Sequence, residues 1–236
     1  MSKPFQFKEF TIEQDQCAMK IGTDGVLLGA WTTVKNEFSI LDLGTGTGVI
    51  SLMLAQRSNA EVIEAIEIDG AAFEQAVSNF ENSMWSDRLS CYHASLHEFA
   101  KEIEEKYELI ISNPPFYTDA NPSTNKERSI ARFEDAMPFS HLANAAAYLL
   151  DPNGIFAIII PYKEEEKFVS LAKENNLFLN RVCRVKGNEK SPIKRSLLEF
   201  SFKETVITEE NLTIETERHV YTEDYKQLVQ DFYLKM

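Results

Sequence analysis

One short segment constrains the fold of this chain more than any other. Ser39–Leu43 is an apolar run with the composition of a buried strand, a loop of sequence Gly-Thr-Gly-Thr-Gly follows at residues 44–48, and Val49–Arg57 has the apolar residues of a packed helix. A strand, a glycine loop and a helix in this order are typical of the ligand-binding edge of a doubly wound α/β sheet. The segment therefore predicts a Rossmann-like α/β fold.

The spacing of the glycines restricts the ligand. Gly44, Gly46 and Gly48 allow a tight backbone turn and the close approach of a cofactor. The pattern is neither the dinucleotide fingerprint G-x-G-x-x-G nor a P-loop, because no Gly-Lys-Ser/Thr follows it. Since no lysine is present to hold phosphates, we expect a ligand that contains adenosine without a pyrophosphate.

A carboxylate stands at the end of the next predicted strand, residues 61–68, about 20 residues beyond the glycine loop. An acid at this place can accept hydrogen bonds from both hydroxyls of a ribose. Alternation puts Glu67 on the same side of the strand as Ala65, whereas Asp69 is suited to cap the helix that follows. We therefore expect Glu67 to bind the ribose.

Two further strands are predicted at Leu89–His93 and Tyr107–Ser112. The first is followed by residues 94–96, which we expect to border the adenine ring of the ligand. The second ends in Asn113-Pro114-Pro115-Phe116, and two consecutive prolines cannot extend a strand because neither has an N–H to donate. Ligands of open α/β sheets bind at the carboxyl ends of the strands, so the glycine loop and this motif are expected to face one crevice.

The Asn-Pro-Pro-Phe motif has two interpretations. From its four residues alone, a proline turn beside a core phenylalanine is as good an explanation as a functional one. Its position at the carboxyl end of a sheet strand favours the second interpretation. The amide of Asn113, the carbonyl of Pro114 and the ring of Phe116 could together hold a planar group that carries an NH2.

The net charge of −13 argues at first against a nucleic-acid partner. Its distribution weakens that argument, because basic residues gather in two predicted loops that could meet phosphates. One loop contains Lys126, Arg128 and Arg132, and the other contains Arg181, Arg184, Lys186, Lys190, Lys194 and Arg195. From charge alone, solvated loop charges explain the pattern equally well.

Composition is that of an ordinary globular protein, with 44% hydrophobic and 26% charged residues. No apolar run approaches the roughly 18 residues of a membrane span, and the first residues lack the apolar core of a secretion signal, so we expect a cytoplasmic location. The three cysteines, Cys17, Cys91 and Cys183, are far apart and are expected to be reduced. His93 and His97 lack a third ligand nearby, so no metal site is predicted.

The sequence predicts two parts, an N-terminal extension at residues 1–38 that packs on the cofactor site and a Rossmann-like domain at residues 39–236. Phenylalanines alternate with polar residues near the start of the extension, which indicates a short strand. Glycines flank Thr23-Asp24, a pattern that predicts a helix start with a side-chain N-cap. Such a start can place backbone N–H groups against a carboxylate or a phosphate.

Several of these motifs resemble those of the class I S-adenosylmethionine-dependent methyltransferases. Asp42-Leu-Gly-Thr-Gly-Thr-Gly48 is similar to the cofactor loop of that family, and Asn113-Pro-Pro-Phe116 is similar to the N/D-P-P-Y/F motif of enzymes that methylate exocyclic or amide nitrogens. Residues 7–10, residues 14–31, the basic loop at 126–132 and Pro192-x-Lys-Arg195 further resemble the YfiC-type tRNA(Val) adenine-N6-methyltransferases. These enzymes modify the adenosine just 3′ of the anticodon, at position 37.

The resemblance implies a seven-stranded class I methyltransferase fold, S-adenosyl-L-methionine as cofactor with S-adenosyl-L-homocysteine as product, and a tRNA substrate. It implies no metal, no membrane and no obligate protein partner. The implied catalytic residues are Asn113, Pro114, Pro115 and Phe116. The implied cofactor ligands are Lys20, Thr23, Asp24, Asp42, Gly44, Thr45, Gly46, Gly48, Glu67, Ile68, Ser95 and Asn113. The implied tRNA contacts are Phe116, Tyr117, Lys126, Arg128, Arg132, Lys190, Lys194 and Arg195.

Other functions stay open at this point. A guanine N2-methyltransferase of ribosomal RNA and a protein-glutamine N5-methyltransferase use closely similar motifs, because the planar NH2 group is common to all three substrates. A cofactor-binding RNA chaperone without turnover is the non-enzymatic alternative. Many relatives also carry an acid or an amide where this chain has Ser95, so the sequence leaves open which residue borders the adenine.

Overall fold

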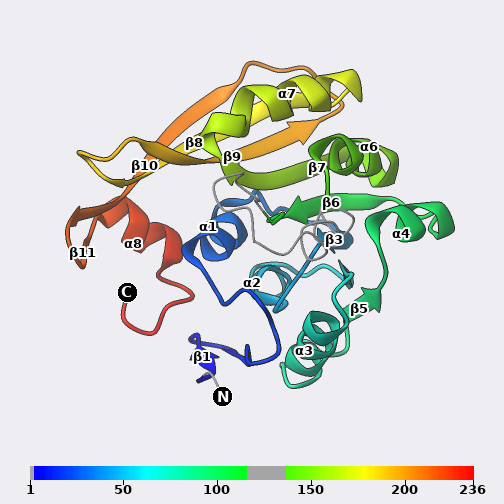
Figure 1. The fold of residues 1–236 in the computed structure, drawn as a ribbon, viewed down its shortest axis with the longest axis horizontal. Coiled ribbons are helices and arrows are strands. Elements are labelled where there is room, and N and C mark those ends of the chain that lie inside the picture. The colour runs from blue at the N-terminus through cyan, green and yellow to red at the C-terminus, as the bar shows by residue number, and fades with distance from the viewer. Residues whose placement is uncertain (1–2, 116–136) are drawn as a thin grey trace, which may run out of the picture.

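A nine-stranded mixed sheet runs through the part of the chain that the computed structural model describes, residues 3–115 and 137–236 (Figure 1). Its strand order is β11-β10-β8-β9-β7-β6-β3-β4-β5. The strands are β3 (Ser39–Leu43), β4 (Val62–Glu67), β5 (Leu89–His93), β6 (Tyr107–Ser112), β7 (Leu150–Pro161), β8 (Phe178–Asn188), β9 (Ile193–Ser201), β10 (Thr208–Glu217) and β11 (Val220–Tyr221).

The order of the strands reverses between β3 and β6. From β3 the chain proceeds to β4 and then β5 at one edge, and it returns to β6 on the other side of β3. The five strands from β5 to β7 are parallel, whereas β9 runs antiparallel to both β7 and β8. The predicted Rossmann-like fold is therefore confirmed, with a topological switch point where β3 and β6 lie side by side.

Two strands extend the sheet beyond the seven that were expected. β10 pairs in parallel with β8, and β11 pairs with β10. The sequence did not predict them, because β10 is rich in acids and buries only Leu212 deeply. Its place in the sheet depends on side chains of distant elements, which form no local pattern.

Helices cover both faces of the sheet, because the parallel strands are apolar on both sides. One hydrophobic cluster lies under α1 (Thr23–Trp31), α2 (Val49–Arg57), α3 (Gly70–Glu81) and α8 (Glu223–Val229). A second cluster lies on the opposite face under α4 (Leu96–Glu102), α6 (Phe139–Leu149) and α7 (Glu165–Glu174). Within the described residues, no helix is long and apolar enough to cross a membrane.

The segment around Phe7 lies against the segment around Tyr233, because these two residues form an antiparallel bridge. Figure 1 shows the N-terminal hairpin on the same side of the molecule as the C-terminal segment. A small hairpin of β1 (Phe5–Gln6) and β2 (Thr11–Ile12) reaches the C-terminal segment, where the Lys8 N–H donates to the carbonyl of Phe232 at 2.8 Å. Phe7 stacks on Phe10 and on Tyr233, with ring centroids 4.6 and 5.8 Å away. The predicted N-terminal extension therefore shares one hydrophobic core with the rest of the chain.

Candidate functional site

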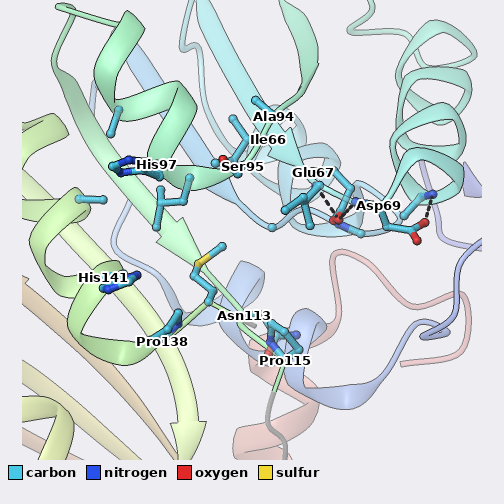
Figure 2. A pocket seen from close by; sticks show the side chains of 18 of the residues that line it. Ile66, Glu67, Asp69, Ala94, Ser95, His97, Asn113, Pro115, Pro138 and His141 are labelled. Carbon is cyan, nitrogen blue, oxygen red and sulfur yellow. Dashed lines mark hydrogen bonds between the residues drawn. The ribbon is translucent and has the colours of Figure 1, made fainter. Parts of the chain in front are cut away.

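The carboxyl ends of β3, β4, β5 and β6 open onto one cavity of about 1190 Å³ (Figure 2). Gly44 and Gly46 line it from the loop after β3, Glu67 from the end of β4, Ser95 from the start of α4, and Asn113 from the end of β6. The prediction that the glycine loop and the Asn-Pro-Pro motif face one crevice is therefore confirmed. This space is called the first cavity below.

The glycine loop has the left-handed backbone that its sequence suggested. Gly44, Gly46 and Gly48 have φ angles of 75°, 57° and 80°, which favour glycine. A Cβ on Gly48 would lie 2.5 Å from Cε1 of Phe80, whereas a Cβ on Gly46 would meet nothing within 4 Å. Gly48 is thus required for packing against α3, and Gly46 presents bare backbone to the first cavity.

Asp42 lies beneath this loop and has no exposed surface. Its Oδ2 accepts hydrogen bonds from the hydroxyls of Thr45, at 2.6 Å, and Ser51, at 2.7 Å. Burial raises the pKa of Asp42 to about 6. Its Oδ1 is buried and has no hydrogen-bond partner among the described residues. Asp42 and Thr45 were both predicted as cofactor ligands, and the structure places them as supports of the loop, outside the cavity lining.

Glu67 is held rigidly at the end of β4. Its Oε2 accepts the N–H of Gly46 at 2.8 Å, and its Oε1 accepts the N–H groups of Ile68 and Asp69 at 2.9 and 3.0 Å (Figure 2). Asp69 instead caps α3, because its Oδ1 accepts the N–H of Ala72 at 2.8 Å. The prediction that Asp69 caps this helix is confirmed, and Glu67 and Ile68 both line the first cavity.

Ser95 has a structural partner as well as a place in the first cavity. Its hydroxyl donates to the carboxylate of Glu98 at 2.7 Å and accepts the N–H of Glu98 at 3.2 Å, which forms a capping box at the start of α4. The N–H of Ser95 also donates to the Glu98 carboxylate, at 3.0 Å, and these two donors, the hydroxyl and the N–H of Ser95, hold the pKa of Glu98 below its usual value. Beyond Ser95 the cavity continues between α4 and α6, where His97 and His141 lie (Figure 2).

Asn113 stands between two cavities. It lines the first cavity together with Pro115, and it lines a second cavity of about 750 Å³ together with Pro114. Its Nδ2 lies 3.7 Å from the position that a Cβ on Gly25 would occupy, so the amide nitrogen is turned toward α1. Five other predicted contacts lie outside the described residues, namely Phe116, Tyr117, Lys126, Arg128 and Arg132.

The N-terminal segment closes one side of both cavities. Cys17, Ala18 and Met19 line the first cavity, where burial raises the pKa of the Cys17 thiol to about 11 and keeps it neutral. The three predicted cofactor ligands of this segment, Lys20, Thr23 and Asp24, line the second cavity instead. The predicted side-chain N-cap of α1 is wrong, because Gly22 occupies the N-cap position and no side chain bonds there. Asp24 is paired with Arg195, and their atoms Oδ2 and Nε are 2.7 Å apart.

Two buried amides that the sequence did not single out hold this segment in place. The Asn79 side chain accepts the N–H of Glu13 and donates to the carbonyls of Glu13 and Thr47, each at 2.9 Å. Gln75 accepts the N–H of Gln16 at 3.0 Å. Both amides are less than 4% exposed and lie on the buried face of the amphipathic helix α3. A polar residue among the apolar residues of that face could have indicated in the sequence that its side chain has a buried hydrogen-bond partner.

The predicted basic loop near the C-terminal strands is much shorter than expected. β8 extends to Asn188 and β9 begins at Ile193, which leaves Lys190 in an exposed turn. Arg181 pairs with Glu210 at 2.9 Å, and Arg184 pairs with Glu165 at 2.7 Å. These two arginines serve the structure, whereas Lys194 and Arg195 line the second cavity. In residues 3–115 and 137–236, no group of three or more His, Cys, Asp or Glu residues could hold a metal ion.

Comparisons with known proteins agree with this geometry. The family described as Methyltransferase small domain matches residues 21–174. A tRNA1(Val) (adenine(37)-N6)-methyltransferase from Christiangramia forsetii is 56% identical over 100% of this chain and 99% of its own length. One of the same name from Flavobacterium psychrophilum is 57% identical over 98% of this chain and 100% of its own length.

Among solved structures, a predicted O-methyltransferase from Agrobacterium tumefaciens has a TM-score of 0.69 at 17% identity and covers 89% of this chain and 96% of its own. At this identity the likeness concerns the fold alone. The family match spans more than half of the chain, and the curated relatives span its whole length. The chain therefore belongs to the methyltransferase small domain family, in the group of the tRNA1(Val) (adenine(37)-N6)-methyltransferases.

Proposed function

We propose that this protein transfers a methyl group from S-adenosyl-L-methionine to the exocyclic N6 of adenosine 37 in tRNA1(Val). The full-length identity of 56–57% to relatives with this name is the observation that carries the proposal. The site agrees with it, because Asn113 stands between a cavity suited to an adenosine-containing cofactor and a second cavity at the same edge of the sheet. The substrate implies action in the cytoplasm.

The first cavity fits this cofactor. A carboxylate has about four acceptor positions, and Glu67 uses three for backbone N–H groups, so one is left for a ribose hydroxyl. The bare backbone of Gly46 allows close approach of the ligand. The charged residues of the lining are Glu67, Asp69 and Lys101, an excess of acid that suits a ligand with a sulfonium and an ammonium group. Bound there, the cofactor would supply an electrophilic methyl group.

The residues of the Asn-Pro-Pro motif would act on the acceptor amine. The lone pair of an adenine amine is delocalised into the ring, so the amine is a poor nucleophile. The side-chain oxygen of Asn113 and the carbonyl of Pro114 can accept its two N–H bonds and draw the nitrogen toward tetrahedral geometry. They also stabilise the positive charge that develops as the N–C bond forms and the S–C bond breaks. The methylated nitrogen then loses a proton to water, so a dedicated general base is not required.

The function is tested by incubating the protein with labelled cofactor and bulk tRNA, followed by mass spectrometry of the nucleosides. N6-methyladenosine is the expected product. N2-methylguanosine would instead indicate the guanine N2 activity, and label in protein would indicate glutamine methylation. A protein that binds the cofactor but transfers no label to any of these substrates would be the RNA chaperone of the non-enzymatic alternative.

A further inference from the structure

The second cavity lies where three strand ends meet. Asn113 and Pro114 follow β6, Pro161 ends β7, and Ile193 begins β9. Because β9 is antiparallel to β7, with Pro161 opposite Arg195, the start of β9 lies at the carboxyl end of β7. The cavity therefore opens at the same edge of the sheet as the first one, on the other side of Asn113.

Two side chains enter this cavity because of the way β7 ends. Pro161 cannot continue the ladder, and the short 3-10 helix η1 (Tyr162–Glu164) follows at once. This turn places Tyr162 and Lys163 in the cavity lining. Tyr162 is 43% exposed, unlike the buried residues of β7 that precede it. Its ring shares the lining of the second cavity with Asn113 and is therefore accessible to a ligand bound there.

The charge of the second cavity is opposite to that of the chain. Its lining contains four basic residues, Lys20, Lys163, Lys194 and Arg195, against one acid, Asp24. The whole chain carries a net charge of −13. Asp24 is paired with Arg195, and Lys163 lies 3.8 Å from Glu164 while 62% of its side chain is exposed. A local excess of cations on an acidic protein favours a polyanionic partner at this place.

We propose that the second cavity holds the acceptor nucleobase, with Tyr162 as the ring on which the base stacks and with Lys163 and Lys194 as contacts to the neighbouring phosphates. The inference rests on the proposed function and deepens it. A base stacked on Tyr162 would lie beside Asn113 and Pro114, which must reach its amine. The volume of about 750 Å³ is within the range of about 300–1,000 Å³ of ligand sites.

Stacking is tested with two variants of Tyr162 and one control variant of Tyr92. Tyr162→Phe keeps the ring, and Tyr162→Leu removes it while keeping an apolar side chain. Tyr162→Leu should lower kcat/KM for tRNA about 5- to 150-fold, as expected for loss of one stacked base, and cofactor affinity should not change. Tyr162→Phe should be close to wild type. Tyr92→Leu is the control, because Tyr92 is equally exposed, at 41%, on the far edge strand β5.

The phosphate contact has a closely matched control. Lys163 and Lys167 both lie near Glu164, at 3.8 and 3.9 Å, but only Lys163 lines the cavity. Lys163→Gln should lower the salt slope of tRNA binding by about 0.7 to 0.9, and Lys167→Gln should leave it unchanged.

The outcomes separate this inference from the proposed function. If the wild type is active and Tyr162→Leu has the same kcat/KM for tRNA as Tyr162→Phe, the stacking role is overturned while the proposed function stands. An equal salt slope in the two lysine variants would overturn the phosphate contact. A wild type that methylates no RNA would remove the proposed function and this inference with it.

Discussion

Asn79 provides a quantitative test of how the N-terminal segment is attached to the site. Its side chain makes three hydrogen bonds, two to the backbone of Glu13 and one to the carbonyl of Thr47 in the glycine loop. Asn79→Ala would leave all three backbone groups without their partner. At about 1 kcal/mol for each hydrogen bond, the expected loss of unfolding free energy is about 3 kcal/mol. In a chain of this size this corresponds to a fall in Tm of about 6–12 °C.

The assay combines thermal unfolding with cofactor binding. Cys17, Ala18 and Met19 line the first cavity only a few residues beyond Glu13, so the variant should also bind S-adenosylmethionine more weakly. Asn82→Ala is the matched control, because Asn82 lies at the end of the same helix and its side chain donates to Ser78 within that helix. If Asn79→Ala lowers Tm no more than Asn82→Ala does, the amide does not anchor the segment and the reasoning is refuted.

Two further predictions concern the glycine loop. Burial raises the pKa of Asp42 from 3.8 to about 6, so between these pH values the folded state binds more protons than the unfolded state. Stability contributed by this group is therefore present at low pH and lost as pH rises toward 6. Asp42→Asn should remove about 3 kcal/mol of this pH dependence of the unfolding free energy. Urea unfolding of both proteins at pH 4 and pH 7 checks this, and an equal change in unfolding free energy between the two pH values would contradict it. Gly48→Ala should lower the unfolding free energy by at least about 1–2 kcal/mol for the left-handed backbone alone, and by more because its Cβ would meet Phe80 at 2.5 Å. Gly46→Ala has open space around its Cβ, so it should lower the unfolding free energy less in the same experiment and weaken cofactor binding more.

The elements that the sequence predicted best are those with a strong local pattern. β3 and α2 could be located from a continuous apolar strand followed at once by three glycines, and β6 could be located from an apolar run that ends in two prolines. The place of Glu67 at the end of β4 and the capping of α3 by Asp69 followed from strand alternation and helix capping, both of which are local rules. The edge strands β10 and β11 could not be found in this way, because their partner β8 decides their place.

The charged residues show where sequence reasoning is insufficient. Arg181 and Arg195 look equivalent in the sequence, but Arg181 bonds to Glu210 from β10 and lies over the ring of Trp31, whereas Arg195 pairs with Asp24 beside the second cavity. These partners are 29 to 171 residues away along the chain. The same limit applies to Tyr162. In the sequence it is simply the residue after a strand-ending proline, and it lines a cavity because the end of β6 and the start of β9 lie there too.

The central claim is that Asn113 holds the amine of an adenine next to the anticodon. Its most direct test compares wild type and Asn113→Ala in methyl transfer from labelled cofactor to tRNA, with the modified nucleotide located by mass spectrometry of ribonuclease fragments. We expect N6-methyladenosine at position 37 in the wild-type reaction and a rate about 10²–10³-fold lower in the variant, with cofactor affinity retained. Near-normal turnover by Asn113→Ala, or a methyl group on any other nucleotide, would contradict the account.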